Sequence, residues 1–293
     1  MMNQFSSGST IQPNSTQDMS TAIYRTAAKP VLTLDYPLDK INSNIWGGIE
    51  NLIEHEQLVF GMEKRGFKQE ANVVCRFVAD KLSLSAYDKR IYIAVSSIFN
   101  SGNKIISPAQ IYAKMGSKGR PNQNAIAKIN ESLTMMRSAN LYLNNEDEIK
   151  VNTRYRHFYY DGALLPFERV NAYINNMHCA SAIHIREEPP LVSFARERGQ
   201  ITTVPLKLLN SPVSKTVQNL CIEDYLIERI AHMRKGKIKC KLTFSTICQR
   251  CRLTEKKQKQ RLPDKLKIFL THYQNCGYIK GFDISDDIVY IQC

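Results

Sequence analysis

Cys248 and Cys251 are separated by two residues, a spacing at which two cysteines commonly bind one zinc ion. A structural zinc site needs four ligands, and no second Cys-x-x-Cys or histidine pair accompanies them. The remaining candidate ligands are Cys240, His272, Cys276 and Cys293. Both thiols also fall near Ile247 on the inner side of a predicted helix, where free cysteine packs as a small apolar residue. The pattern favours two buried thiols and no metal, with a zinc site as the alternative.

Histidines, tyrosines and carboxylates form no pattern that is typical of an enzyme. The glycine-rich loops that hold nucleotides are missing from the sequence. A nicking enzyme of the rolling-circle type would place His-hydrophobe-His beside a tyrosine, but the closest histidines, His178 and His184, are six residues apart. The acidic run from Glu146 to Glu148 is typical of a solvated turn. We therefore predict a protein without catalysis or cofactor.

Positive charge is concentrated near the C-terminal end. The 293 residues include 40 Lys and Arg against 27 Asp and Glu, a net charge of +13. Between Arg234 and Lys267 thirteen basic residues face only Glu255 and Asp264, a net +11. A basic segment that only keeps the protein soluble is the alternative. A stretch whose charges are almost all positive favours a surface that binds DNA phosphates. The candidate contacts are Arg250, Arg252, Lys256, Lys257, Lys259, Arg261 and Lys265.

A second, weaker basic segment lies between Lys104 and Arg137, where six basic residues oppose Glu131 alone. Its candidate DNA contacts are Lys118, Arg120, Gln123, Asn124 and Lys128. The last three open a predicted helix, and Gln, Asn and Lys side chains in that position can bind base edges in the major groove. An ordinary polar helix face is the alternative.

The elements that carry these residues repeat in one order. Apolar residues at helical spacing predict a helix from Ala86, which ends at Ser101-Gly102-Asn103. Ser107-Pro108-Ala109-Gln110 predicts the start of a short second helix, and a third is buried through Ile126, Ile129, Leu133 and Met136. A strand at 141–143, a polar turn at 144–148 and a strand at 151–160 would complete a winged helix.

The same order returns after Ser214. A long helix to about Arg234 precedes a short strand at Lys241-Leu242 and a helix capped by Thr243. A third helix is predicted to bury Leu262, Leu266, Phe269, Leu270 and Tyr273 and to end at Gly277. Strands at YIKGF and DIVYIQ flank the turn Ser285-Asp286-Asp287.

The sequence therefore predicts an α+β fold of two tandem winged helices. We expect a disordered tail at 1–28, a first unit with a preceding β element at 31–160, a strand-rich connector at 161–213 and a second unit at 214–293. The connector strands would be ALLPF, SAIHI, PLVSF and ITTVPL, and two strands would flank the polar GMEKRGFKQE in the preceding β element. The sequence has no membrane-length apolar run or secretory signal, and its eight cysteines fit a reducing cytoplasm.

Two basic winged helices joined by strands resemble the replication initiators of plasmids and related mobile elements. The residues 201–230 are similar to their connector strand and following long helix, and 261–279 to their recognition helix and hairpin. The resemblance implies a protein that binds repeats of an origin in double-stranded DNA and recruits a host helicase or primase, in some cases also acting as a homodimer. A transcriptional regulator built from the same units is the alternative.

Overall fold

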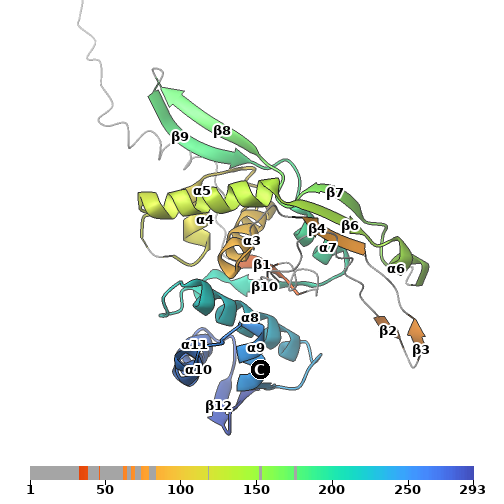
Figure 1. Ribbon diagram of the computed structural model, residues 1–293, viewed down its shortest axis with the longest axis vertical. Coiled ribbons are helices and arrows are strands. Elements are labelled where there is room, and N and C mark those ends of the chain that lie inside the picture. The colour runs from red at the N-terminus through yellow and green to blue at the C-terminus, as the bar shows by residue number, and fades with distance from the viewer. Residues whose placement is uncertain are drawn as a thin grey trace, which may run out of the picture.

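A computed structural model describes residues 33–38, 46, 62–64, 67–69, 74–78, 84–117, 119–151, 154–174 and 177–293. Helices and five small sheets alternate through these ranges, which confirms the predicted α+β class. Two groups of elements follow one another along the long axis of the molecule (Figure 1). The expected tail at 1–28 lies outside the described residues, and none of the described helices is long and apolar enough for a membrane span.

The three helices of the first unit form where the sequence predicts them. They are α3 (Ala86–Asn100), α4 (Pro108–Lys114) and α5 (Gln123–Ser138). Ser107 caps α4 through a reciprocal capping box with Gln110, and Pro108 occupies the first turn. Helix α5 begins because the Asn122 side chain accepts a hydrogen bond from the Ala125 amide, at 2.8 Å. Its apolar side chains at 129, 133 and 136 are buried against the other two helices, while Ile126 is half-buried.

The strands of the first unit pair differently from the predicted hairpin. Strand β5 (Ile105–Ile106), which precedes α4, pairs with β9 (Met177–His184), and β9 pairs with β8 (Glu168–Ile174). The segment predicted as a hairpin forms β6 (Asn140–Asn144) and β7 (Tyr159–Ala163), which join β4 (Val74–Val78) in a separate sheet. The hairpin that pairs with the short strand before α4 is therefore β8–β9, downstream of the predicted hairpin.

The polar turn predicted at 144–148 is wrong, because α6 (Glu146–Val151) occupies most of it. Lys150 pairs with Glu146 and Asp147 within this helix, and acidic residues in the first turn favour the helix dipole. Glu148 is fully buried and bound to Arg198. The helix delays the second strand, which begins at Tyr159 and not at 151.

The connector contains a helix that the sequence analysis interpreted as a strand. PLVSF belongs to α7 (Pro190–Glu197), in which Leu191, Phe194 and Ala195 are buried at helical spacing. Strand β10 (Ile201–Pro205) follows and pairs with β1 (Thr33–Pro37), and the short 3-10 helix η1 (Leu206–Leu209) leads to the second unit. The polar GMEKRGFKQE segment itself contains paired strands, β2 (Met62–Lys64) and β3 (Phe67–Gln69). The strand predicted before it lies outside the described residues.

The second unit follows its predicted order closely. Its elements are α8 (Val217–Arg234), β11 (Lys241–Thr243), α9 (Phe244–Arg250), α10 (Lys256–Gln260), α11 (Leu262–Asn275), β12 (Gly281–Ser285) and β13 (Ile288–Gln292). Thr243 caps α9, and Gly277 has a positive φ of 70° just beyond α11, as predicted. The short α10 was not predicted. The sheet order β11-β13-β12 matches β5-β9-β8, so both units place a short strand beside the last strand of their hairpin.

The first helices of the two units, α3 and α8, pack against each other in the middle of the molecule (Figure 1). Arg90 of α3 is fully buried and forms ion pairs with Glu223 and Asp224 of α8. The Tyr36 hydroxyl of β1 donates to Asp224 Oδ1 at 3.0 Å. This contact joins the strand pair β1–β10 to both helices, so that the two units are held together by buried charges as well as by apolar packing.

Candidate nucleic-acid interface

The basic stretch of the second unit lies on its surface. Twelve of the thirteen basic side chains between Arg234 and Lys267 are exposed, and Lys265 is half-buried. None of the thirteen forms an ion pair with another residue that the structure describes. Surface cations without nearby acidic partners create a positive potential that attracts polyanions. The fold therefore leaves this charge accessible to a phosphate backbone.

Helix α10 and its preceding turn present the cations most directly. No side chain of α10 is buried, and Lys256, Lys257 and Lys259 are all exposed. Arg252 adopts a positive φ of 50° just beyond α9, where the Leu253 amide donates to the Cys248 carbonyl at 2.8 Å. This turn directs the exposed chain from Arg250 toward α10. The predicted contacts Arg250, Arg252, Lys256, Lys257, Lys259 and Arg261 are thus all exposed along one segment, in which Cys251 and Leu253 are buried.

Lys265 differs from the other predicted contacts of this unit. Its Nζ donates to Gln218 Oε1 at 3.1 Å, which ties α11 to the first turn of α8. Partial burial, with the nearby Arg261 charge, lowers the pKa of Lys265 from its usual value. The side chain therefore contributes to helix placement as well as to the charge of the surface.

Helix α11 exposes residues that the sequence-based selection of basic side chains missed. Its buried side consists of Leu262, Leu266, Phe269, Leu270 and Tyr273. The opposite side carries an outward stripe of exposed residues, which we define as Asp264, Lys267, Ile268, Thr271 and Asn275. Helical spacing alone could have found this stripe, because it is the complement of the predicted buried face.

The candidate residues of the first unit cluster at the amino end of α5. Gln123 and Asn124 are exposed in its first turn, and Arg120 is exposed in the preceding turn. Lys128 is also exposed, with its Nζ 4.3 Å from the centre of the Tyr87 ring. This cation–π contact orients the ammonium group. Lys118 lies outside the described residues.

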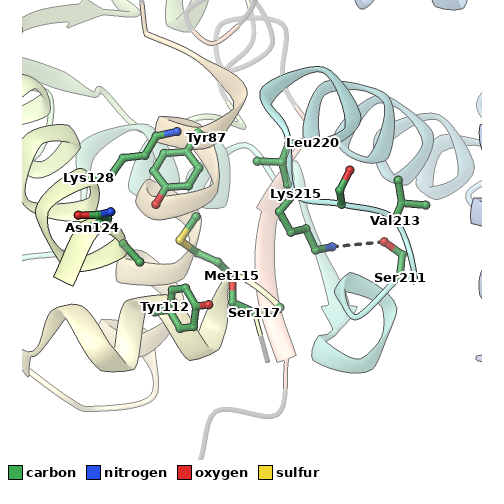
Figure 2. Close-up of a pocket in the computed structure, with 13 residues that line it drawn as sticks. Tyr87, Tyr112, Met115, Ser117, Asn124, Lys128, Ser211, Val213, Lys215 and Leu220 are labelled. Carbon is green, nitrogen blue, oxygen red and sulfur yellow. Dashed lines mark hydrogen bonds between the residues drawn. The ribbon is translucent and has the colours of Figure 1, made fainter. Parts of the chain in front are cut away.

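A cleft of about 510 Å³ separates the amino end of α5 from the loop that leads into α8. Figure 2 shows Asn124 and Lys128 on one side of it and Ser211 and Lys215 on the other. Lys215 is bound within the protein, to the Leu209 carbonyl, Ser211 and Glu223, and burial lowers its pKa. Burial and the nearby Asp88 raise the pKa of Tyr87, in the cleft wall, to about 12. Among the described lining residues, Lys128 is the lysine without an ion-pair or hydrogen-bond partner, and its ammonium group lies over the Tyr87 ring.

The two sets of candidate contacts lie on one side of the molecule in Figure 1, where the amino end of α5 and helices α10 and α11 all appear at the left. The cleft between α5 and the loop that leads into α8 has walls from both units. It brings Lys128 and Lys215, 87 positions apart in the sequence, to one site.

The Cys-x-x-Cys pair occupies the position that the helix prediction implies. Cys251 is buried and Cys248 is half-buried at the end of α9. Within the described part of the chain, histidine, cysteine and carboxylate side chains form no cluster of three or more that could hold a metal ion. Instead, a hydrogen bond with Cys221 and burial raise the pKa of Cys251.

Comparisons with known proteins give a fold likeness at low identity. No protein-family model matches the chain, and no curated protein matches it. The crystal structure of a selenomethionine derivative of domains 2 and 3 of RctB is 11% identical, with a TM-score of 0.47, covering 87% of this chain and 100% of that one. A second crystal structure of RctB domains 2-3 is 11% identical, with a TM-score of 0.43, covering 82% of this chain and 92% of that one.

Proposed function

We propose that this protein is a sequence-specific double-stranded DNA-binding protein that initiates replication of a plasmid or an integrated mobile element, without catalysis. In this proposal both units are winged helices. Each has a first helix, a short strand, further helices and a hairpin, with the short strand beside the last hairpin strand. The further helices are α4 and α5 in the first unit and α9, α10 and α11 in the second. The β8–β9 hairpin is the wing of the first unit, and β12–β13 is the wing of the second.

The observation that carries DNA binding is the exposed, unpaired positive charge of the second unit. Twelve exposed cations have no ion-pair partner among the described residues, and of these Arg234 contacts the Tyr278 ring and Lys235 donates to the Ile201 carbonyl. Each one that contacts a DNA phosphate releases condensed counterions, which makes binding favourable at low salt and weaker as salt increases. The exposed cations of α10 supply this contribution without depending on the DNA sequence.

Sequence recognition is assigned to one recognition helix in each unit: α5, the third helix of the first unit, and α11, the last helix of the second. In helix-turn-helix proteins this helix enters the major groove, and units of one chain can bind sites about one helical turn apart. Two linked units gain affinity because the first contact raises the effective concentration of the second. The buried ion pairs between α3 and α8 fix the spacing of the two units, which favours one defined distance between their half-sites.

The role in replication is tested with a plasmid whose own origin is inactive in the host cell. The plasmid carries the DNA that flanks the coding region, and this protein is supplied from a second plasmid. We expect the test plasmid to be maintained only when the protein is present and only when direct repeats beside an A·T-rich tract are intact.

Two other outcomes would change the proposal. Specific binding to the flanking DNA with repression of a promoter, but without plasmid maintenance, would identify a transcriptional regulator. Binding that does not distinguish the flanking DNA from random duplex would contradict a sequence-specific function altogether. A variant with Gln123, Asn124 and Lys128 changed to Ala removes exposed side chains of the recognition helix α5 only, and should fail to maintain the plasmid.

A further inference from the structure

Helix α11 presents one large apolar side chain to solvent directly after the basic stretch. Ile268 is 43% exposed, although all five buried side chains of the same helix lie on the opposite side. Its neighbours on the outward stripe are polar, with Lys267 beside it and Asp264 and Thr271 one turn away on either side. A phosphate-binding surface has no use for an isoleucine at this position, because phosphates are contacted by donors and cations.

The Asp264 carboxylate is equally unsuited to phosphate. It lies exposed in the first turn of α11, between the basic α10 and Lys267, and no described cation forms an ion pair with it. Against a phosphate its charge would be repulsive. Facing base edges it becomes useful, because Asp can accept a hydrogen bond from the amino group of cytosine, and an apolar side chain can contact the thymine methyl group.

The orientation of this stripe is fixed by contacts two turns apart on one flank of the helix. Lys265 binds Gln218 of α8, and His272 Nε2 lies 3.1 Å from the carbonyl oxygens of Lys207 and Leu208 in η1. Together with the buried apolar side these contacts prevent rotation of α11 about its axis. The outward stripe therefore faces one direction in every molecule, as base recognition requires.

We infer that the outward stripe of α11 reads bases in the major groove, with Ile268 in contact with the methyl group of one thymine. The inference rests on the proposed DNA-binding function and assigns a specificity-determining residue to it. In this arrangement Thr271 adds a second contact to the same or the next base pair, and Asp264 favours cytosine at the amino end of the helix. The lysines of α10 bind the adjacent backbone.

The test replaces single thymines by uracil, which removes only the C5 methyl group. A binding site is first selected from a random duplex pool with the full-length protein. Each thymine in the site is then changed to uracil, and fluorescence anisotropy gives the affinity of the unchanged protein and of Ile268→Ala for each duplex. We expect one thymine whose methyl group contributes about fourfold to the affinity of the unchanged protein, the ratio that burial of one methyl group gives.

At that thymine, Ile268→Ala should bind the thymine and uracil duplexes equally well. Ile268→Val, which keeps a branched apolar side chain, should retain part of the discrimination. The matched control is Val217→Ala, which shortens an apolar side chain that is 44% exposed on α8 but does not lie on α11. It should keep the full difference between thymine and uracil.

The outcomes separate this inference from the proposed function. If the unchanged protein binds its selected site specifically, but Ile268→Ala keeps the same uracil sensitivity at every position, the assignment of Ile268 is wrong and DNA binding stands. If the pool yields no preferred site, both the assignment and sequence-specific binding are wrong. Ile268 is exposed, so Ile268→Ala should melt at the same temperature as the unchanged protein, and circular dichroism checks that it folds.

Discussion

Arg90 of α3 and Asp224 of α8 form an ion pair from which solvent is excluded, and Glu223 binds the same guanidinium group at 3.0 Å. Burial alone would lower the pKa of Arg90, but Asp224, Tyr36 and Glu223 together outweigh it and raise the pKa above its usual value. The arginine is thus charged at every accessible pH. A buried charge of this kind depends on its partners, since desolvation costs several kcal/mol that only the partners can offset.

We predict that Arg90→Ala strongly destabilises the protein, because it leaves two buried carboxylates without their guanidinium partner. The expected loss in the free energy of unfolding is about 3–5 kcal/mol, measured by urea denaturation followed by circular dichroism. As a control, Lys150→Ala removes an exposed ion pair in α6 and should leave the denaturation midpoint unchanged. A midpoint for Arg90→Ala close to that of the control would show that apolar packing, and not the ion pairs, joins the units.

The α10 lysines are predicted to control the salt dependence of DNA binding. Changing Lys256, Lys257 and Lys259 to Ala should weaken binding to all duplexes, and should reduce the slope of log affinity against log salt by up to about three. Fluorescence anisotropy between low and moderate salt measures this slope. The double variant Lys150→Ala/Arg186→Ala also removes exposed cations, but outside α10, and should keep the original slope. An unreduced slope in the α10 variant would exclude α10 from the phosphate contact.

Gln123 and Asn124 are predicted to contribute to specificity. Replacing both by Ala should cost roughly 1–3 kcal/mol for each lost base contact on the selected site, while binding to random duplex barely changes. Titrations with the selected and a scrambled duplex give the comparison. Asn122→Ala is the informative control, because it removes the N-cap of α5 and should lower stability by about 1 kcal/mol without removing a base contact. Equal losses on both duplexes would show that the two side chains only position the protein.

The thiol of Cys251 is predicted to resist alkylation in the folded protein. Its hydrogen bond with Cys221 and its burial raise its pKa, and only the thiolate reacts. Iodoacetamide near pH 8, followed by peptide mass spectrometry, should label the exposed Cys240 well before Cys251. In denaturant both should react at similar rates. Rapid labelling of Cys251 in the native protein would contradict the buried thiol.

Zinc is predicted to be dispensable for folding. Elemental analysis of protein purified without chelator should show well under one zinc ion per chain, because Cys248 and Cys251 lack a second pair of ligands among the described residues. Stoichiometric zinc that is lost, together with the fold, in Cys248→Ser would overturn this prediction.

Local patterns predicted where α4 and α9 begin and where α11 ends, because capping signals act over a few residues. The Ser107 capping box, the Thr243 cap and the glycine after α11 each act within one turn of the chain, and the structure contains all three. The pairing of β5 with β9 depends on residues about 80 positions apart, for which the sequence has no local signal. The α7 segment was misread because its buried run of apolar residues suits a strand as well as a helix, as short apolar runs do.

The site was predicted by charge and therefore only in part. Basic residues are easily counted, and twelve of the thirteen in the C-terminal stretch are exposed. Ile268 and Thr271 carry no charge and were not selected, although their position opposite Leu266 and Phe269 follows from the helix period. The interaction of Lys265 with Gln218 needs the packing of α11 on α8, which no local pattern specifies.

The stretch from β6 to β7 leaves and re-enters the first unit at a single point. Its flanking residues are joined by the Leu164 amide, which donates to the Ala139 carbonyl at 2.8 Å, and Asn140 faces Ala163 across the strand pair. The chain from β6 to β7 therefore forms a loop whose two ends lie side by side after the last turn of α5. Such an arrangement uncouples the length of the loop from the path of β8. A change of length between α6 and β7 would therefore leave the helix that is assigned to the DNA groove in place, whereas α6 itself is held by the buried ion pair of Glu148 with Arg198.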